Sequence, residues 1–384
     1  MGPMSPVETD PPETHEPGSD DQSTGDLIVP EAQPGTPEAE DPGIDRPFGQ
    51  ENRLKLIEEF FNTKGADAHW RNVYRLLLWA DKTTGLAHCY ESDKSQPGKP
   101  WYPRSLRFHD WLSDALASTP AEVGDQIDWL FQRVAEDYSL ELMRRLDAQR
   151  LKAAKQLEPY AGKGFPEPGT DPDIVDVVKD VLGAKLSPPS PEEWRILTLR
   201  IREVVALENK RRNMVGEGFE DLLSTMVRRI DENNTMSVSA RSLLGDIPGF
   251  RNAQKGGKAI KVDLALVRKH DEERTLVTAK WSIRADRERQ FKSDFDDYVS
   301  ANMWQKSFKY VLVTNEFDPA RLVRACEQLA TNAPLFSEVV HIAPAAIQAA
   351  YGSHPKERRM REVMKYIDDG RIIGLDDWLG NMAG

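Results

Sequence analysis

The sequence predicts an α/β protein with a mixed β-sheet flanked by helices, preceded by a mainly helical N-terminal region. From about residue 191 onward, short apolar stretches alternate with longer amphipathic stretches. Strands interleaved with helices in this way are typical of an α/β core. Before about residue 160, apolar residues recur at three- and four-residue spacing, which is typical of packed helices.

Composition divides the 384 residues into four predicted segments. Residues 1–48 hold ten prolines and a single aromatic residue, so they lack the apolar surface that stabilises a core. We therefore predict a disordered acidic tail, for which a passive solubilising role is favoured over screening of a basic site. Residues 49–160 are expected to form the helical domain, 161–190 a linker, and 191–384 the α/β domain.

The helical region contains one ambiguous stretch. Residues 54–61 and 125–157 have helical spacing. Between them, residues 73–91 are apolar enough for a helix, but the turn-forming residues from Asp81 to Gly85 also fit a β-hairpin. The sequence leaves both interpretations open.

The α/β domain is expected to begin with two helices over residues 192–230, separated by a break near Gly216. Ser282 is the expected N-cap of the helix that follows the second strand. The predicted strands span 259–267, 274–282, 307–316 and 337–343, and the predicted helices span 284–304, a stretch from Pro319 and the C-terminal residues.

Charge is distributed unevenly along the chain. The net charge of −12 is concentrated in the tail, where residues 1–50 carry twelve acids and one base. By contrast, Lys255–Lys292 contains eleven basic and six acidic residues. Because a local basic surplus on a nearly neutral body is the electrostatic signature of a nucleic-acid-binding surface, double-stranded DNA is the expected partner.

Several other classes of protein are disfavoured. No apolar run is long enough for a membrane span, and the acidic N-terminus is unlike a secretory signal. Cys89 and Cys326 lack metal-ligand spacing, which indicates reduced thiols and a cytoplasmic protein. Gly256 and Gly257 lack the phosphate-loop pattern, so no ATP dependence is expected; their loop either contacts DNA phosphates or is a plain hairpin.

One acid and one lysine stand out on neighbouring strands. Asp263 lies inside the first predicted strand and Lys280 ends the second, and the short connection between them predicts a hairpin that brings them together. Metal-assisted phosphodiester hydrolysis uses such a pair, because the carboxylate holds Mg²⁺ and the lysine positions the attacking water. A structural salt bridge is the competing interpretation. The candidates for a further acid are Glu217, Glu220 and Asp294.

A charged cluster follows the lysine at once. Arg284, Asp286 and Arg287 stand four, six and seven residues after Lys280. Arginine donates bidentately to guanine and aspartate accepts from the cytosine amino group. In the first turn of a helix, Arg284 and Arg287 would share one face. The cluster therefore predicts readout of G·C pairs in the major groove, beside the site of chemistry.

The motifs resemble those of a known family. They are "VD" ending at Asp263, "TAK" ending at Lys280, "RADR" over 284–287, and an acid at Asp294, fourteen residues after the lysine. Together they resemble the CCGG-family type II restriction endonucleases of the PD-(D/E)xK superfamily, and the BsaWI-like members in particular. The sequence departs from the family at the usual proline, at the triplet acid and in the usual glutamate, which are Val262, Thr278 and Asp294 here.

The match covers about residues 217–297 and implies a PD-(D/E)xK catalytic core with a DNA-embracing helical N-terminal domain. It also implies Mg²⁺-dependent cleavage of a palindrome with a CCGG or CC-N-GG core by a homodimer or a tetramer. By this resemblance, Asp263, Asp294 and Glu220 hold Mg²⁺, with Glu217 as the rival of Glu220. Lys280 lies beside the attacking water, Arg284 and Arg287 contact guanines, and Asp286 contacts cytosines.

Two other functions stay open from the sequence. One is a different PD-(D/E)xK nuclease, for repair or for a DNA structure, in which the arginines only hold phosphates. The other is a catalytically inactive protein that binds a specific DNA sequence. Both alternatives use the basic segment to bind DNA. The first differs from the restriction endonuclease in lacking base readout, and the second differs in lacking cleavage.

Overall fold

A computed structural model describes residues 46–66, 68–81, 86–88, 97–158, 172–182, 190–304 and 306–383, and the contacts within Ile44–Gly384 join these ranges into a single unit. Nearly all of the predicted acidic tail, most of the predicted linker and Cys89 lie outside the described residues. Cys326 is a buried free thiol. Within the described ranges, no helix combines the length and the apolarity needed to cross a bilayer.

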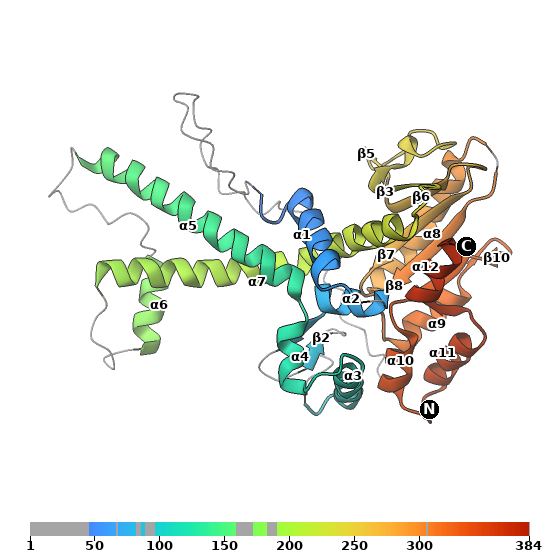
Figure 1. The fold of residues 1–384 in the computed structure, drawn as a ribbon, viewed down its shortest axis with the longest axis horizontal. Helices are drawn as coiled ribbons and strands as arrows, with labels where there is room; N and C mark the ends of the chain where they lie inside the picture. Colours follow the sequence, from blue (N-terminus) through green and yellow to red (C-terminus); the bar gives the residue numbers. More distant parts are fainter. Residues whose placement is uncertain are drawn as a thin grey trace, which may run out of the picture. The chain divides into compact units, whose positions relative to one another are not determined.

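A six-stranded mixed sheet forms the centre of the C-terminal half of the chain, in the order β12-β11-β8-β7-β6-β3. Strands β8, β7, β6 and β3 are labelled in Figure 1. The four strands from β12 to β7 are parallel, whereas β6 and β3 join antiparallel. This arrangement confirms the predicted mixed sheet. The strands are β3 (Met236–Leu243), β6 (Lys261–Arg268), β7 (Arg274–Lys280), β8 (Lys309–Thr314), β11 (Glu338–His341) and β12 (Ile372–Gly374).

Helices flank this sheet. Helix α7 packs across β3, β6 and β7, and aromatic residues of α8 stack on Tyr310 of β8. The helices are α1 (Gln50–Thr63), α2 (His69–Leu77), α3 (Tyr102–Ala115), α4 (Pro120–Gln126), α5 (Trp129–Leu157), α6 (Pro172–Leu182), α7 (Pro191–Ile230), α8 (Ala285–Ala301), α9 (Pro319–Glu327), α10 (Pro344–Tyr351), α11 (Arg358–Asp368) and α12 (Leu375–Ala383). A 3-10 helix spans Leu244–Asp246. The remaining described strands are the short β1 (Trp79–Asp81), β2 (Leu86–His88), β4 (Gln254–Lys255), β5 (Lys258–Ala259), β9 (Leu329–Ala330) and β10 (Ala333–Pro334).

The predicted break near Gly216 is wrong, because α7 is one continuous helix of 40 residues. It starts at a capping box in which Ser190 and Glu193 bond reciprocally. Glycine costs about 1 kcal/mol in a helix interior relative to alanine, but here tertiary packing compensates. A Cβ at Gly218 would lie 3.3 Å from Leu77 and 3.4 Å from Leu130, so glycine permits the close approach of α2 and α5 to α7.

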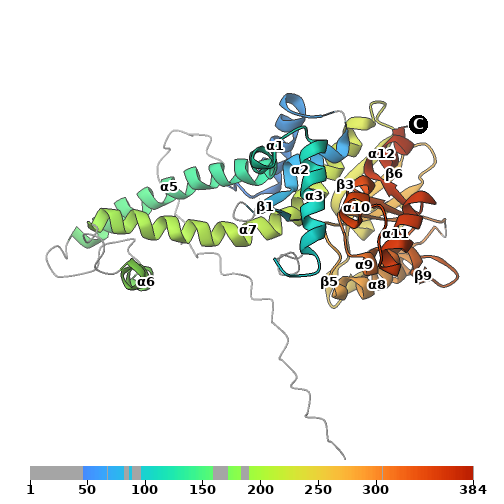
Figure 2. The same cartoon turned by 90° about the horizontal axis from the view of Figure 1, so that it is seen from below.

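The N-terminal helices pack directly on α7, the helix that carries the candidate acids Glu217 and Glu220. α1, α2 and α5 all contact α7, and Figure 1 and Figure 2 show α5 and α7 both extending away from the sheet. The ambiguous stretch at 73–91 contains both predicted elements in sequence. Helix α2 ends at Leu77, and β1 then pairs antiparallel with β2, Trp79 opposite His88. The predicted turn after Asp81 lies outside the described residues.

Candidate active site

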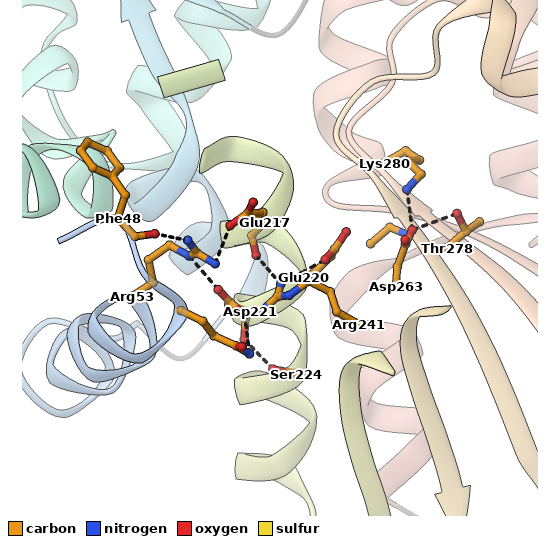
Figure 3. Close-up of polar contacts among 12 residues, drawn as sticks. Phe48, Arg53, Glu217, Glu220, Asp221, Ser224, Arg241, Asp263, Thr278 and Lys280 are labelled. Atoms are coloured by element: carbon orange, nitrogen blue, oxygen red, sulfur yellow. Dashed lines mark hydrogen bonds and ion pairs between the residues drawn. The ribbon is translucent and has the colours of Figure 1, made fainter. Parts of the chain in front are cut away.

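The predicted acid and lysine meet at one point of the sheet (Figure 3). The Lys280 Nζ donates to Asp263 Oδ2 at 2.6 Å. The same oxygen accepts from the Ala279 amide at 3.0 Å and from the Thr278 hydroxyl at 3.2 Å. Thr278 therefore supports the aspartate. With side chains 23% and 24% exposed, Asp263 and Lys280 are half-buried but still reached by solvent.

The strands separate where this pair lies. Pairing between β6 and β7 ends at Leu264 opposite Val277, whereas β7 continues along β8 until Lys280 lies opposite Thr314. The Ala279 amide donates to the Asp263 carboxylate beyond the last β6 pair. The carboxylate thus occupies the opening between two diverging strands. A local end of ladder pairing of this kind exposes side chains that would otherwise be covered by the neighbouring strand.

Glu220 on α7 is the acid that the structure brings to this pair. Its side chain is only 12% exposed. Burial and then the charge of Asp263 raise the pKa of Glu220 to about 7, against the opposing effect of Lys280. Glu217 points elsewhere in Figure 3: its carboxylate is 55% exposed and pairs with Arg53 at 2.8 Å.

Asp294, on α8, is partly buried, and its carboxylate forms an ion pair with a lysine. Its carboxylate lies 3.2 Å from the Lys255 Nζ, which is also 3.0 Å from Asp297. Burial raises the pKa of Asp294 against the opposing effect of Lys255, and the charges of Asp297 and Asp263 make smaller contributions that also raise it. Lys255 belongs to the short β4–β5 hairpin, whose turn residues Gly256 and Gly257 have positive φ. The loop that contains Gly256 and Gly257 is thus the turn of a hairpin, and this hairpin brings Lys255 into an ion pair with Asp294.

The described residues contain no group of three or more histidine, cysteine, aspartate or glutamate side chains already arranged to hold a metal ion. Mg²⁺ does not require a complete protein cage, because one or two carboxylates with waters and substrate phosphates usually bind it. Glu220 and Asp263 fit this requirement. They are close enough for one charge to raise the pKa of the other, and a divalent cation would relieve that repulsion.

The chain after Lys280 leads directly into α8. The helix begins at Ala285, and its N-cap is Arg284 rather than the predicted Ser282. Arg284 is exposed, and Asp286 and Arg287 belong to the first turn of α8; their side chains lie outside the described residues. The structure therefore places the backbone of the "RADR" segment at a helix N-terminus, four residues from the Asp263–Lys280 pair.

The position of this segment is fixed by a buried carboxylate after β8. Glu316 accepts from the Ile283 amide at 2.6 Å, and also from the amides of Phe317 and Asp318 at 2.9 and 2.7 Å. The Asn315 amide donates to the Trp281 carbonyl at 3.0 Å. The exits of β7 and β8 are therefore joined side by side, and the start of α8 is held relative to Lys280.

No family model matches the chain, and no curated protein sequence matches it. Among solved structures, a complex of the restriction endonuclease PspGI with substrate DNA is similar with a TM-score of 0.37 and 10% identity, over 86% of this chain and 91% of that one. The protein VC1899 from Vibrio cholerae is similar with a TM-score of 0.22 and 15% identity, over 75% of this chain and 56% of that one. Neither similarity carries a functional argument, so the geometry of the site must carry it.

The sequence did not indicate Arg241 on β3, which lies beside Glu220. Arg241 has a φ of 54°, and the β3–β6 register skips its pairing with Asp263. A non-glycine residue in this conformation costs about 1–3 kcal/mol. Its guanidinium contacts Glu220 Oε2 at 3.1 Å and also the fully buried carboxylate of Asp221. A polar residue in a serine-rich strand gave no sequence signal for this role.

His341, at the end of β11, predicts acid sensitivity of the fold. Its buried ring contacts the Glu316 carbonyl at 3.1 Å and accepts from the Ala343 amide, so it is held neutral. Burial lowers the pKa of His341 to about 3, against about 6.5 when unfolded. As the pH falls, the unfolded chain binds a proton at His341 before the folded chain does. The contribution of neutral His341 to the free energy of unfolding is therefore fully present above pH 6.5 and is lost progressively as the pH falls toward 3. At pH 5 the expected loss is roughly 2 kcal/mol.

Urea unfolding between pH 7 and pH 5 measures this loss. His341→Gln keeps a donor and an acceptor but does not titrate, so its free energy of unfolding should change less with pH than that of the wild type. The exposed His270 is the matched control, and His270→Gln should retain the wild-type pH dependence. An equal pH dependence in wild type and His341→Gln would contradict the role of His341.

Proposed function

We propose that the protein is a Mg²⁺-dependent type II restriction endonuclease with a PD-(D/E)xK core. It would cleave double-stranded DNA at a palindrome with a CCGG or CC-N-GG core. The observation that carries the proposal is the Asp263–Lys280 contact of 2.6 Å, with Glu220 in electrostatic reach, at the point where β6 and β7 separate. A structural salt bridge would not need a second, partly protonated acid held beside it.

In this function each side chain has a separate task. Asp263 and Glu220 would hold Mg²⁺, with Asp294 as a third acid once Lys255 leaves it. When bound, Mg²⁺ polarises the scissile phosphate and makes a neighbouring water more acidic. Lys280, fixed by Asp263, would orient the attacking water with its ammonium group. In-line attack on phosphorus would leave a 5′-phosphate and a 3′-hydroxyl.

Base readout would come from the start of α8. Arg284 and Arg287 would contact guanines and Asp286 would contact cytosines in the major groove. A palindromic site presents the same bases on both strands, so a homodimer with one active site per strand is the matching assembly. The helical N-terminal region, whose α1, α2 and α5 contact α7, would form an arm along the DNA.

Digestion of a sequenced plasmid with the purified full chain and Mg²⁺ tests the proposal. New ends mapped by sequencing should cluster at one palindrome with a CC…GG core, and they should disappear when EDTA is added. Ends without a preferred sequence would leave a nuclease but remove base readout by the "RADR" segment. Sequence-specific binding without cleavage, over several metals, would indicate the inactive DNA-binding protein instead.

A further inference from the structure

The feature that needs explanation is the conformation of Arg241. It lies in the middle of β3, and continuing the strand register would place it opposite Asp263. Its φ of 54° is one that an arginine rarely adopts inside a strand. Strained residues of this kind persist only where the surrounding structure holds them, and they concentrate at functional sites. Something other than sheet formation therefore holds Arg241.

Three oxygen atoms of α7 surround its guanidinium (Figure 3). The Arg241 Nη1 donates to Glu220 Oε2 at 3.1 Å and to the Glu217 carbonyl at 3.2 Å, and Nη2 donates to Asp221 Oδ1. The side chain is 25% exposed. A guanidinium presents its donors in a rigid fork, so contacts to one helix fix its orientation.

Asp221 anchors the arrangement from behind. Its side chain is fully buried and shared between two arginines, because Arg53 of α1 donates to Asp221 Oδ2 at 2.8 Å. Arg53 is itself only 4% exposed and bonds the Phe48 carbonyl. A buried carboxylate between two guanidiniums is charge-compensated on both sides. The bonds through Asp221 therefore restrain the Arg241 side chain in one orientation.

We propose that Arg241 is a positioning residue that holds the Glu220 carboxylate in place for Mg²⁺ beside Asp263, and this rests on the proposed function. Without the guanidinium, the partly buried Glu220 would face Asp263 with one fewer counter-charge and would turn away. Groups that orient metal ligands in this way usually change metal affinity or activity by about 10–100-fold when they are replaced. Arg53 and Asp221 extend this support to α1, so the N-terminal helices stabilise the metal ligands.

Two substitutions separate positioning from folding. Arg241→Met removes the guanidinium and keeps the strained backbone, whereas Arg241→Gly removes it and relieves the strain, because glycine accepts a positive φ. Both variants are expected to raise the Mg²⁺ concentration for half-maximal cleavage by about 10–100-fold. Arg241→Lys should recover part of the loss, because it keeps the charge but not the fork. The control is Arg268→Met on β6, whose partners are Asp271 and Glu273.

Mn²⁺ binding, followed by electron paramagnetic resonance in the presence of duplex DNA, gives a readout independent of cleavage. Weaker binding by Arg241→Gly than by wild type and Arg268→Met supports the proposal, even if the wild type cleaves no DNA and the proposed nuclease function fails. Unchanged Mn²⁺ affinity in a folded Arg241→Gly overturns it. A wild-type chain that binds no Mn²⁺ overturns the metal site and the positioning role together.

Discussion

Lys280→Met is expected to lower the rate of Mg²⁺-dependent cleavage by about 10²-fold while leaving DNA binding intact, because the attacking water would no longer be held in line with the phosphorus. The Lys280 Nζ contacts Asp263 at 2.6 Å, and in the proposed function it orients the attacking water. Asp263 keeps its bonds from the Ala279 amide and the Thr278 hydroxyl, so the site should remain folded. Single-turnover cleavage of a cognate duplex measures the rate.

The matched control is Lys309→Met. Lys309 lies on the neighbouring strand β8 and pairs with Glu273 at 3.0 Å, away from Asp263. Its substitution should leave the cleavage rate at the wild-type level. Binding in Ca²⁺ distinguishes a catalytic loss from an unfolded chain. A Lys280→Met variant that cleaves at the wild-type rate would reduce the Asp263–Lys280 contact to a structural salt bridge.

Arg287→Ala is expected to reduce discrimination between a CCGG-containing duplex and its single-base variants by about 10–100-fold, the range for one lost bidentate base contact. Arg287 belongs to the first turn of α8, one turn after Arg284, in a segment held by the Glu316 bond to Ile283. A fixed segment is required for this effect, because a mobile arginine would contact phosphates instead. Binding constants for cognate and variant duplexes, each over a salt series, measure the change.

Arg289→Ala on the same helix is the control for Arg287. Arg289 is exposed and lies two residues further on, which turns it about 200° around the helix axis. It should leave discrimination unchanged. Uniform weakening by Arg287→Ala on every sequence, with a smaller salt slope, would show a phosphate contact. That result would favour a nuclease of the same superfamily without base readout.

The centre of the fold follows from local sequence patterns. The strands β6, β7, β8 and β11 each contain a short apolar run, as expected for strands covered on both faces, and the β6–β7 hairpin is a short local connection. Strand β3 was missed because "MSVSARSL" has few large apolar residues, and its pairing with β6 supplies the stability that its sequence lacks. At Gly216 the sequence predicted a break that the structure does not have, because the buried residues Met214 and Phe219 before and after it hold α7 continuous.

The candidate site was predictable only in its central pair. Asp263 and Lys280 were predicted to meet because they lie on adjacent strands of one hairpin. The choice of Glu220 over Glu217 depends on which way α7 faces, which only the packing of α7 on the sheet decides. Arg241 was missed because its position depends on a positive φ and on contacts to a helix that precedes β3 in the chain.

The conformation of Arg241 has a further effect on the outer side of the sheet. In the described sheet β3 is a terminal strand, and an unpaired strand edge is a template onto which another chain can add. A residue with positive φ turns its peptide groups out of that row of donors and acceptors. We therefore expect the positive φ of Arg241 also to disfavour edge-to-edge aggregation, and a β-branched residue there to weaken both effects.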